Sequence, residues 1–331
     1  MKKWLVLGFA CLMLASFLAG CGSQQKAPDK PAAFTPSKST EFVVPYAAGG
    51  GSDLYARILS DIIQKNKIVN EAVMVVNKAG GGGAVGDAYT FSKKGDNHTI
   101  TTFVSGQMTA SLMNKTAVTY DKLTPIANLA LDEYLLGVAA DSYKSFADFL
   151  AAAKAAPDTI TIGGSGKGTE DELCVGLLTK YTGAKFKYVA FNSSGEVMAA
   201  VLGGHIKAGI FNPNECNAQM EAGKVKTIGE FGTKRLGGIF KDTPTFTELG
   251  HKDVVFQQFR GIAGPPGMSP EAVKFWVDVL KKATQTEQWK KDYLAKNGLT
   301  DHFLEPADFK KFMDGENKKY ADILKDIGAL K

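Results

Sequence analysis

The stretch EFVVPYAAGGGSDLYAR, residues 41–57, decides how the chain begins to fold. A short apolar run at 42–44 meets Pro45 and three glycines, and Ser52 and Asp53 then open a segment with apolar residues at helical spacing. This order predicts a strand, a glycine loop and a helix. Glycines let backbone N–H groups approach a ligand closely, and a helix start carries unpaired N–H groups and partial positive charge. We therefore expect an anion-binding loop here.

The same order of strand, loop and helix recurs along the chain. Further strands are predicted at 72–76, 99–104, 159–162, 187–190, 206–211 and 225–230. This rhythm is typical of parallel α/β sheets, in which the loops at the carboxyl ends of the strands line the ligand crevice. A long apolar stretch at 126–140 is interpreted as a strand that crosses between two lobes, and 254–263 as another long strand. The expected fold is therefore α/β with two lobes, each a mainly parallel sheet flanked by helices.

The C-terminal region is expected to be helical. Ser269 is a good N-cap, with Pro270 at the first helical position, and helices are predicted at 271–283, 287–297 and 306–327. In the last of these helices a stripe of large apolar residues falls at helical spacing, namely Phe309, Phe312, Tyr320, Ile323 and Leu324. We interpret this stripe as core packing rather than as a partner surface.

The first forty residues have the pattern of targeting signals. Lys2 and Lys3 precede a short uncharged apolar run, as in a secretory signal peptide, and the run ends Leu18-Ala19-Gly20-Cys21, which resembles a bacterial lipobox. We expect residues 1–20 to be removed and Cys21 to carry the lipid; a plain signal peptide with a chance cysteine is the alternative. Residues 21–40 are rich in Pro, Ser, Gln, Ala and Lys and are expected to form a flexible tether.

The net charge gives no indication of a nucleic-acid partner, and the cysteine content leaves one possible disulfide. Removal of residues 1–20 takes away two lysines and no acidic residue, so the formal net charge falls from +5 to +3, too little to indicate a nucleic-acid partner. Cys174 and Cys216 could pair in an oxidising compartment, but two small buried residues are the preferred interpretation.

No catalytic or metal-binding pattern is visible in the sequence. The four histidines are scattered, without the spacing of metal ligands, and no serine elbow is present. The stretch GSGKGT at 164–169 lacks the spacing of a P-loop, and the glycines at 49–51 lack that of a dinucleotide site. Asp53 is interpreted as a residue that stabilises the helix start together with Arg57. We therefore expect a binding protein, not an enzyme, without cofactor or metal.

An ordered set of motifs resembles the solute-binding proteins of tripartite tricarboxylate transporters, the Bug family. The motifs begin with VPYAAGGGSDLYAR and VVNKAGGGGAVG at 44–57 and 75–86 and continue with GGSGKGTEDEL and YVAFNSSGEVMAAVLGGHIKAG at 163–173 and 188–209; KTIGEFGTKR, DTPTFTELG and FRGIAGPPGMSPEAV follow at 226–235, 242–250 and 259–273. The resemblance implies a two-lobed Venus-flytrap receptor of the periplasmic-binding-protein type II. Its first lobe would comprise 41–135 and 250–331, and its second lobe 136–249.

The resemblance also implies where the ligand is held. The family binds small organic acids with backbone amides and small hydroxyl residues of both lobes. Carried over to this chain, the first-lobe contacts are Tyr46, Gly49, Gly50, Gly51, Ser52, Asp53, Gly81, Gly82, Gly83, Ala84 and Ser105. The second-lobe contacts are Ser165, Gly166, Thr169, Asn192, Ser193, Ser194 and, more weakly, Asn212.

The second-lobe loops depart from the family pattern. This chain has Glu170, Asp171 and Glu172 after the third loop, and it reads Ala-Phe-Asn-Ser at 190–193 where relatives often read Pro-Tyr-Lys-Gly, so the lysine is lost. A less positive wall disfavours a highly charged tricarboxylate. We expect a mono- or dicarboxylate, which can include one that carries a donor group near the acids. A tricarboxylate remains an alternative.

The expected function is that of a lipid-anchored extracytoplasmic receptor, at the cell surface or in the periplasm. As a monomer it would capture a small organic carboxylate and deliver it to the membrane permease subunits of a tripartite tricarboxylate transporter. Three alternatives remain: a binding lipoprotein of another transporter class, with a sulfonate or amino acid as ligand; a sensor that presents its ligand to a receptor; and a secreted enzyme, which lacks visible catalytic residues.

Overall fold

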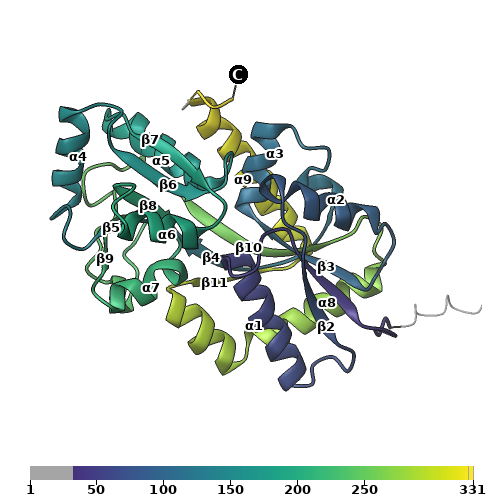
Figure 1. Ribbon diagram of the computed structural model, residues 1–331. Helices are drawn as coiled ribbons and strands as arrows, with labels where there is room; N and C mark the ends of the chain where they lie inside the picture. Colours follow the sequence, from purple (N-terminus) through teal and green to yellow (C-terminus); the bar gives the residue numbers. More distant parts are fainter. Residues whose placement is uncertain (1–32, 327, 331) are drawn as a thin grey trace, which may run out of the picture. The chain divides into compact units, whose positions relative to one another are not determined.

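The computed structural model describes residues 33–326 and 328–330, so the predicted signal peptide and the predicted lipidation site, Cys21, lie outside the described residues. Two sheets flanked by helices make up this part of the chain (Figure 1). The six-stranded sheet has the order β11-β4-β10-β3-β1-β2, and the five-stranded sheet has the order β7-β6-β8-β5-β9. The predicted two-lobed α/β fold is confirmed.

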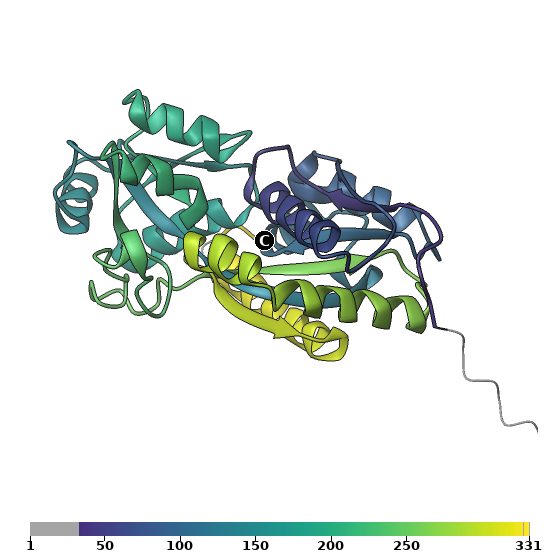
Figure 2. The ribbon, with the colours of Figure 1, turned by 90° about the horizontal axis from the view of Figure 1, so that it is seen from below.

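The first sheet joins strands from both ends of the chain. It consists of β1 (Thr40–Val44), β2 (Val73–Asn77), β3 (Thr99–Val104), β4 (Thr124–Glu133), β10 (Gln257–Gly264) and β11 (Thr300–Leu304). β1 pairs in parallel with β2 and β3, whereas β10 is inserted antiparallel between β3 and β4, and β11 pairs antiparallel with β4. In Figures 1 and 2 the purple N-terminal and yellow C-terminal segments accordingly share one half of the ribbon.

The second sheet is formed by the middle of the chain. Its strands are β5 (Leu135–Ala139), β6 (Thr161–Ser165), β7 (Lys187–Phe191), β8 (Ala208–Phe211) and β9 (Val225–Glu230). β6, β7 and β8 run in parallel, and β5 lies antiparallel between β8 and β9. Each sheet is therefore mixed rather than mainly parallel as predicted, because β10 in the first sheet and β5 in the second run against the direction of both their neighbours.

Two stretches of chain connect the sheets. The apolar stretch predicted to cross between lobes forms β4 in the first sheet and β5 in the second, with Tyr134 between them. The return stretch runs from Phe231 to Phe256 and carries a 3₁₀ turn, η3 (Gly238–Phe240). The Phe231 amide donates to the Tyr134 carbonyl at 2.9 Å, and the Phe256 amide donates to the Phe231 carbonyl, also at 2.9 Å. These bonds hold the two connections side by side.

Helices cover both faces of the first sheet. α1 (Gly51–Lys65), α8 (Pro270–Thr284) and the π-helical segment η4 (Gln288–Ala295) pack into one core cluster with β1, β3 and β4. α3 (Ser105–Asn114) and α9 (Pro306–Asp326) contribute to the other cluster, and α2 (Ala84–Ser92) contacts β1 and β3. In α9 the predicted apolar stripe is core, as expected: Phe309, Tyr320 and Leu324 are buried, and Phe312 and Ile323 pack against them.

The second sheet is flanked by four further helices, which are α4 (Phe146–Ala155), α5 (Glu170–Thr182), α6 (Ser194–Leu202) and α7 (Pro213–Glu221). α5, α6 and α7 each begin directly after a strand of this sheet or within a few residues of it. Their N-termini therefore meet at the carboxyl ends of β6, β7 and β8.

Two features of the fold were not predicted. The strand β11 was not predicted, because its sequence is short and about half of its residues are polar. In the structure its pairing with β4 is irregular between Asp301 and Leu304. The predicted helix at 287–297 forms as the π-helix η4. Short 3₁₀ turns occur at η1 (Gly81–Gly83) and η2 (Tyr120–Lys122).

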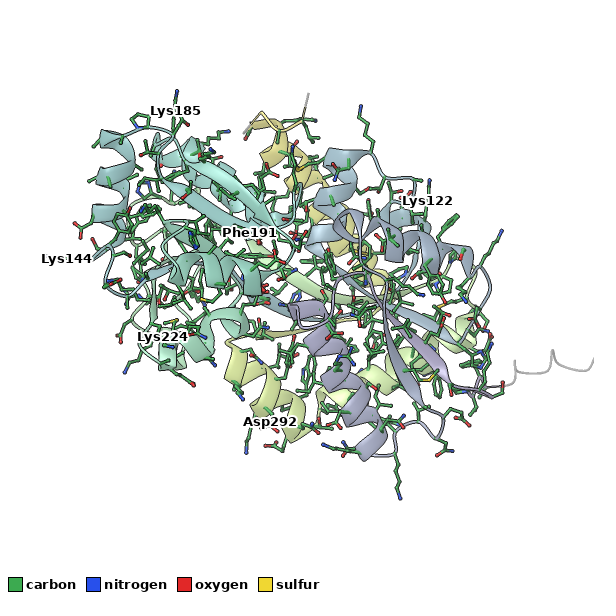
Figure 3. All side chains as sticks on the ribbon, in the orientation of Figure 1. Lys122, Lys144, Lys185, Phe191, Lys224 and Asp292 are labelled. Carbon is green, nitrogen blue, oxygen red and sulfur yellow. The ribbon has the colours of Figure 1, made fainter. Side chains whose placement is uncertain are left out.

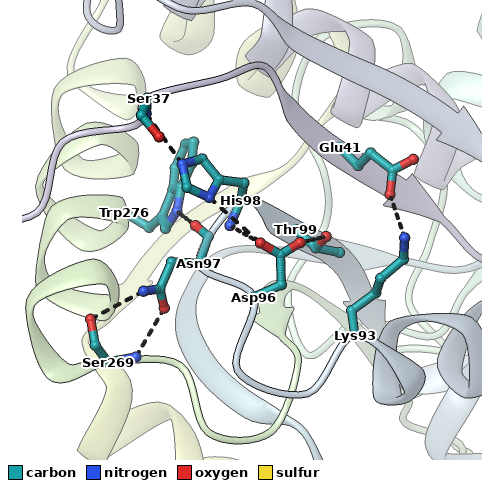
Figure 4. Close-up of polar contacts among 9 residues, drawn as sticks. All are labelled: Ser37, Glu41, Lys93, Asp96, Asn97, His98, Thr99, Ser269 and Trp276. Atoms are coloured by element: carbon teal, nitrogen blue, oxygen red, sulfur yellow. Dashed lines mark hydrogen bonds and ion pairs between the residues drawn. The ribbon is translucent and has the colours of Figure 1, made fainter.

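The end of the predicted tether packs on the folded body (Figure 4). The Ser37 amide donates to Nε2 of His98 at 3.2 Å, and the Phe34 ring meets the rings of His98 and Phe275 edge-on, each at 5.4 Å between centroids. Thr40 already belongs to β1. The prediction of a tether over 21–40 is therefore wrong for its last residues, because Phe34 supplies an apolar anchor that composition alone obscured.

The loop before β3 organises this attachment. Asp96 accepts hydrogen bonds from the His98 amide and the Thr99 hydroxyl at 3.0 and 2.7 Å. Asn97 binds the α8 N-cap: its side chain accepts from the Ser269 amide at 3.0 Å, and its carbonyl accepts from the Trp276 indole at 3.1 Å. Figure 4 shows these contacts beside the ion pair of Lys93 and Glu41. His98 thus serves to attach the segment around Phe34 and Ser37 to the folded body.

Both remaining cysteines are free and buried, which confirms the preferred interpretation of Cys174 and Cys216. Within residues 33–326 and 328–330, no helix is long and apolar enough to cross a membrane.

Candidate ligand-binding site

A cavity of about 680 Å³ lies where the loops of the two sheets face each other. We call first wall the lining residues that belong to the first sheet and its loops, at positions 46–48, 50–52, 79–83, 104, 114, 258 and 260. We call second wall those at positions 165–167, 169–171, 191–194, 212 and 215. Figure 3 labels Phe191 of the second wall near the middle of the view, whereas Lys144 and Lys185 are labelled at its outer edge.

Most of the predicted site residues line this cavity. They are Tyr46, Gly50, Gly51, Ser52, Gly81, Gly82, Gly83, Ser165, Gly166, Thr169, Asn192, Ser193, Ser194 and Asn212. The loops that carry them follow β1, β2, β6, β7 and β8. The rhythm of the sequence had indicated this common edge, because the carboxyl ends of parallel strands meet at one side of a sheet.

Four predicted residues are not among the lining residues: Gly49, Asp53, Ala84 and Ser105. The buried Ser105 hydroxyl accepts from the Phe259 amide at 3.0 Å and from the Tyr320 hydroxyl at 3.2 Å, so it ties α3 to β10 and α9. Ala84 is the first residue of α2, and Gly49 precedes the α1 N-cap.

Asp53 stabilises the glycine loop from behind. Its Oδ2 atom accepts from the Gly49 amide at 3.0 Å and from Arg57 at 2.8 Å, and its Oδ1 atom accepts from Asn77 at 2.9 Å. Burial alone would raise the pKa of Asp53, but these hydrogen bonds outweigh it and hold the pKa below its usual value. The carboxylate therefore stays ionised and fixes the loop that follows β1.

Glycine is required at two places in the first wall. Gly80, Gly81, Gly82 and Gly83 all have positive φ, between 61° and 137°, a conformation that side chains disfavour. At Gly51 the reason is space, because a Cβ there would lie 3.0 Å from Nη2 of Arg260. The guanidinium group of Arg260 thus packs directly against the first turn of α1.

Arg260 is the one charged residue of the first wall. Its side chain is only 1% exposed and forms a buried ion pair with Asp132 of β4. Burial alone would lower the pKa of Arg260, but Asp132 outweighs this effect and raises it. The guanidinium group therefore stays charged beside the α1 N-terminus, where an anion is doubly favoured.

Three buried polar atoms of lining residues have no hydrogen-bond partner within the described part of the chain. They are the Tyr46 hydroxyl, Oε1 of Gln258 and Nε of Arg260. Buried polar groups are nearly always paired in folded proteins. Two donors and one acceptor at the cavity surface therefore indicate where a polar ligand fits.

The second wall is acidic. Its lining includes Glu170, Asp171 and Glu215, of which the first two are buried, and the exposed Lys167. Removal from water raises the pKa of all three acids, and repulsion from Glu170 and Glu215 adds to this effect at Asp171. Glu170 also accepts a hydrogen bond from the Gln258 side chain at 2.6 Å. Each carboxyl group lacks a cationic partner among the hydrogen bonds and ion pairs of the described residues.

The loop amides of the second wall are already occupied by carboxylates of the same chain. The Ser165 amide donates to Asp171 at 2.6 Å, the Asn192 amide to Glu196 at 3.1 Å, and the Asn212 amide to Glu215 at 2.9 Å. We expected these loops to donate their amides to a ligand carboxylate. For these three amides that expectation is wrong, because a carboxylate of the following helix already accepts the hydrogen bond.

Arg260, Asp132 and Gln258 were missed in the sequence. Gln258 and Arg260 are two residues apart on β10 and therefore share a face, and Gln258 is the register partner of Asp132 on β4. The available signal was a charged residue within an otherwise apolar strand, at Asp132 and again at Arg260. Such a charge is stable only when it is paired or functional.

The cavity offers binding groups rather than reactive ones. No cluster of three or more potential metal ligands occurs among residues 33–326 and 328–330. Glycine loops, helix N-termini and one fixed guanidinium group can hold an anion by hydrogen bonds and charge.

Comparison with known sequences agrees with this geometry. Residues 56–329 match the model of the tripartite tricarboxylate transporter family receptor. The chain belongs to this family. It is 30% identical to the UPF0065 protein in the gbd 5′ region of Cupriavidus necator, over 98% of this chain and 96% of that protein. Its identity to the protein BugT of Bordetella pertussis is 24%, over 89% and 90% of the two chains.

Solved structures place the receptor in the same group. A TctC solute-binding protein from Polaromonas is 28% identical, covers 88% of this chain and 99% of its own, and has a TM-score of 0.67. A periplasmic transporter is 25% identical over 88% and 97% of the two chains, with a TM-score of 0.82. These relatives are solute-binding and transport proteins, so the receptor is a binding protein and not an enzyme.

Proposed function

We propose that this receptor captures a small organic carboxylate between two lobes and delivers it to the permease subunits of a tripartite tricarboxylate-type transporter. The observation that carries the proposal is the position of Arg260, a buried charged group at the cavity surface whose Nε atom has no partner within the described chain. The adjacent first turn of α1 supplies N–H groups without intrahelical partners. A carboxylate fits both groups.

The predicted ligand contacts are proposed in the same terms. Tyr46, Gly51 and Ser52 would hold the carboxylate together with Arg260. Ser165, Thr169 and the 192–194 segment would cover the ligand from the second wall. The cavity volume of about 680 Å³ suits a ligand of a few carbon atoms up to about the size of a drug molecule.

The nature of the ligand is supported by two further proteins of the same fold. MatC of Rhodopseudomonas palustris was solved with malate and is 20% identical with a TM-score of 0.78, and another protein of that organism was solved with adipate. Both ligands are small carboxylates, as proposed for this chain.

Capture would involve movement of the two lobes, 41–135 with 250–331 against 136–249. The hinge would lie at Tyr134 and at the paired segment near Phe231 and Phe256. Closure is favoured only by contacts that the ligand makes in the closed form, and the second wall supplies such contacts.

Membrane attachment is proposed to occur through a lipid on Cys21. Substitution of Cys21 by Ser should move the protein from the membrane fraction to the soluble fraction of the exported material. Retention of the Cys21→Ser protein in the membrane fraction would exclude this anchor.

Native mass spectrometry of the freshly purified protein tests the binding function. A retained small organic acid that is lost on mild unfolding and rebinds after refolding is expected. The absence of any retained acid, combined with no heat of binding for a panel of mono-, di- and tricarboxylates, would contradict the proposal.

A further inference from the structure

The side-chain oxygen of Gln258 is a hydrogen-bond acceptor at the cavity surface without a donor in the described part of the chain. Gln258 is 5% exposed and lines the first wall, its Nε2 atom donates to Oε1 of Glu170 at 2.6 Å, and its own Oε1 atom has no partner within the described residues. When Glu170 is ionised, rotation of the amide would set its oxygen against the carboxylate, so the observed orientation is then the favoured one. The carbonyl oxygen can be satisfied only by a hydrogen-bond donor.

Glu170 reaches across the cavity to this position. It is the first residue of α5, on the second wall, yet it contacts Gln258 of β10 and packs so closely on Gly106 that a Cβ there would overlap Glu170 Oε2 and the Tyr46 hydroxyl. A carboxylate of the second wall and two unpartnered polar groups of the first wall thus meet at one point of the cavity.

The acids of the second wall have no cationic partner among the described residues. Arg260 is paired with Asp132, which lies behind it on β4, and the only positive lining residue of the second wall is the exposed Lys167. The ionised forms of Glu170, Asp171 and Glu215 are therefore disfavoured in the ligand-free cavity. A cationic group beside Glu170 would stabilise its carboxylate form, whereas a ligand that carried only negative charge would not.

From this arrangement we infer that the ligand is an amino acid-type zwitterion, with its ammonium group at Gln258 and Glu170 and its carboxylate at Arg260 and the Tyr46 hydroxyl. The inference rests on the proposed function and names the ligand class of that site. Gln258 and Arg260 alternate on one face of β10, only two residues apart, so the two ligand groups are close neighbours, as in an α-amino acid.

Two matched ligand series test the inference by titration calorimetry on the ligand-free protein. L-Aspartate, L-malate and succinate differ only in an ammonium, a hydroxyl or a hydrogen at one carbon, and so do L-alanine, L-lactate and propionate. In the series that fits the cavity, the amine should bind at least tenfold tighter than the hydroxy acid and at least a hundredfold tighter than the unsubstituted acid.

Two variants locate the discrimination. Gln258→Met removes the unpartnered acceptor with little change in volume, and Glu170→Gln removes the charge but keeps the shape. Each variant should bind the amine at least tenfold more weakly than the wild-type protein does. Its affinity for the unsubstituted acid should be within threefold of the wild-type value, or higher. Glu172→Gln is the matched control, because Glu172 lies in the same helical turn but accepts from the Gly168 amide and does not line the cavity.

The outcomes separate the inference from the proposed function. The inference alone is overturned if succinate or propionate binds as tightly as the matching amine or more tightly. It is also overturned if the Gln258→Met and Glu170→Gln proteins prefer the amine as strongly as the wild-type protein does. No binding of any of these acids, together with no retained acid in native mass spectrometry, overturns both.

Discussion

The two walls of the cavity share an architecture and differ in charge. Both are made of loops at the carboxyl ends of strands, followed by helix N-termini. The first wall has glycine loops and one guanidinium group, whereas the second wall has three carboxyl groups that lie within or directly after its loops. The same local fold can therefore present either donors or acceptors, depending on whether the chain caps its own amides.

The cause of the difference is visible in single residues. In the first wall, the α1 N-cap is Gly50, which brings no side chain, and Asp53 turns away from the cavity toward Gly49, Arg57 and Asn77. In the second wall, Asp171 and Glu215 bind the amides of their own loops while lining the cavity. An anion and a cation would thus prefer opposite walls.

Loss of the first wall's charge should have the largest effect. Arg260→Met leaves Asp132 buried without a partner and should lower the free energy of unfolding by about 3–5 kcal/mol, and binding of the ligand should become undetectable. The double variant Arg260→Met/Asp132→Leu should regain most of that stability without regaining binding. Denaturant unfolding and calorimetry measure both effects; wild-type affinity in the double variant would show that the first wall needs no cation.

A pair of acids outside the cavity provides a reference for the second wall. Glu133 and Glu230 are buried, and an unpartnered oxygen of each borders Gly232. Burial raises the pKa of Glu133 to about 8 and that of Glu230 to about 7. Because the folded state holds these protons more tightly than the unfolded state, their stabilising contribution is complete below the ordinary carboxyl pKa and is lost as pH rises through 7 to 8.

The free energy of unfolding should therefore fall by a few kcal/mol between pH 5 and pH 8.5. Glu133→Gln should flatten this dependence, whereas Glu287→Gln, at an exposed site, should leave it unchanged. Denaturant titrations at several pH values provide the measurement. Asp132 and Glu133 lie on opposite faces of β4, so ligand should not alter the Glu133 contribution; a change on adding ligand would place this pair in the binding site after all.

A smaller effect is expected where the first wall touches Arg260. In Gly51→Ala the new Cβ would lie 3.0 Å from the guanidinium group and displace it, so affinity should fall about tenfold, or about 1.4 kcal/mol. Gly50→Ala is the matched control, since its Cβ would meet only the Ala47 carbonyl, at 3.7 Å. If both variants bind alike in calorimetry, the position of Arg260 does not determine affinity.

The smallest effect concerns Ser193 in the second wall. Its hydroxyl caps α6 by accepting from the Glu196 amide at 3.3 Å, and Ser145 caps α4 through Asp148 in the same way outside the cavity. Ser193→Ala and Ser145→Ala should each lose about 1 kcal/mol of stability. Only the first should also weaken ligand binding, by up to about 1 kcal/mol; equal affinities in both would assign Ser193 to capping alone.

The sequence allowed prediction of what depends on local pattern. The strand, loop and helix at 41–57 and the recurring loops led to the α/β fold and to most cavity-lining positions. The acids at 170–172 were noticed as a departure, but the occupied amides of Ser165, Asn192 and Asn212 were not, because a carboxylate three or more residues away can cap a loop or face solvent with the same sequence.

What depends on long-range pairing could not be predicted. Arg260 becomes part of the cavity only because β10 is inserted antiparallel between β3 and β4, which aligns Gln258 with Asp132. Likewise Glu133 and Glu230 meet because two connections cross between the sheets. A single sequence does not specify such registers, although a charge within an apolar strand marks where to look.

Proton linkage tests the unlike charges of the two walls most directly. Burial raises the pKa of Glu170, Asp171 and Glu215, so a cationic group that enters beside them should drive protons off. Calorimetry of one ligand in two buffers of different ionisation enthalpy counts these protons. The account predicts proton release and tighter binding as pH rises for an amino acid, and both effects should shrink in Glu170→Gln. Proton uptake on binding of the natural ligand, with affinity falling as pH rises, would contradict it.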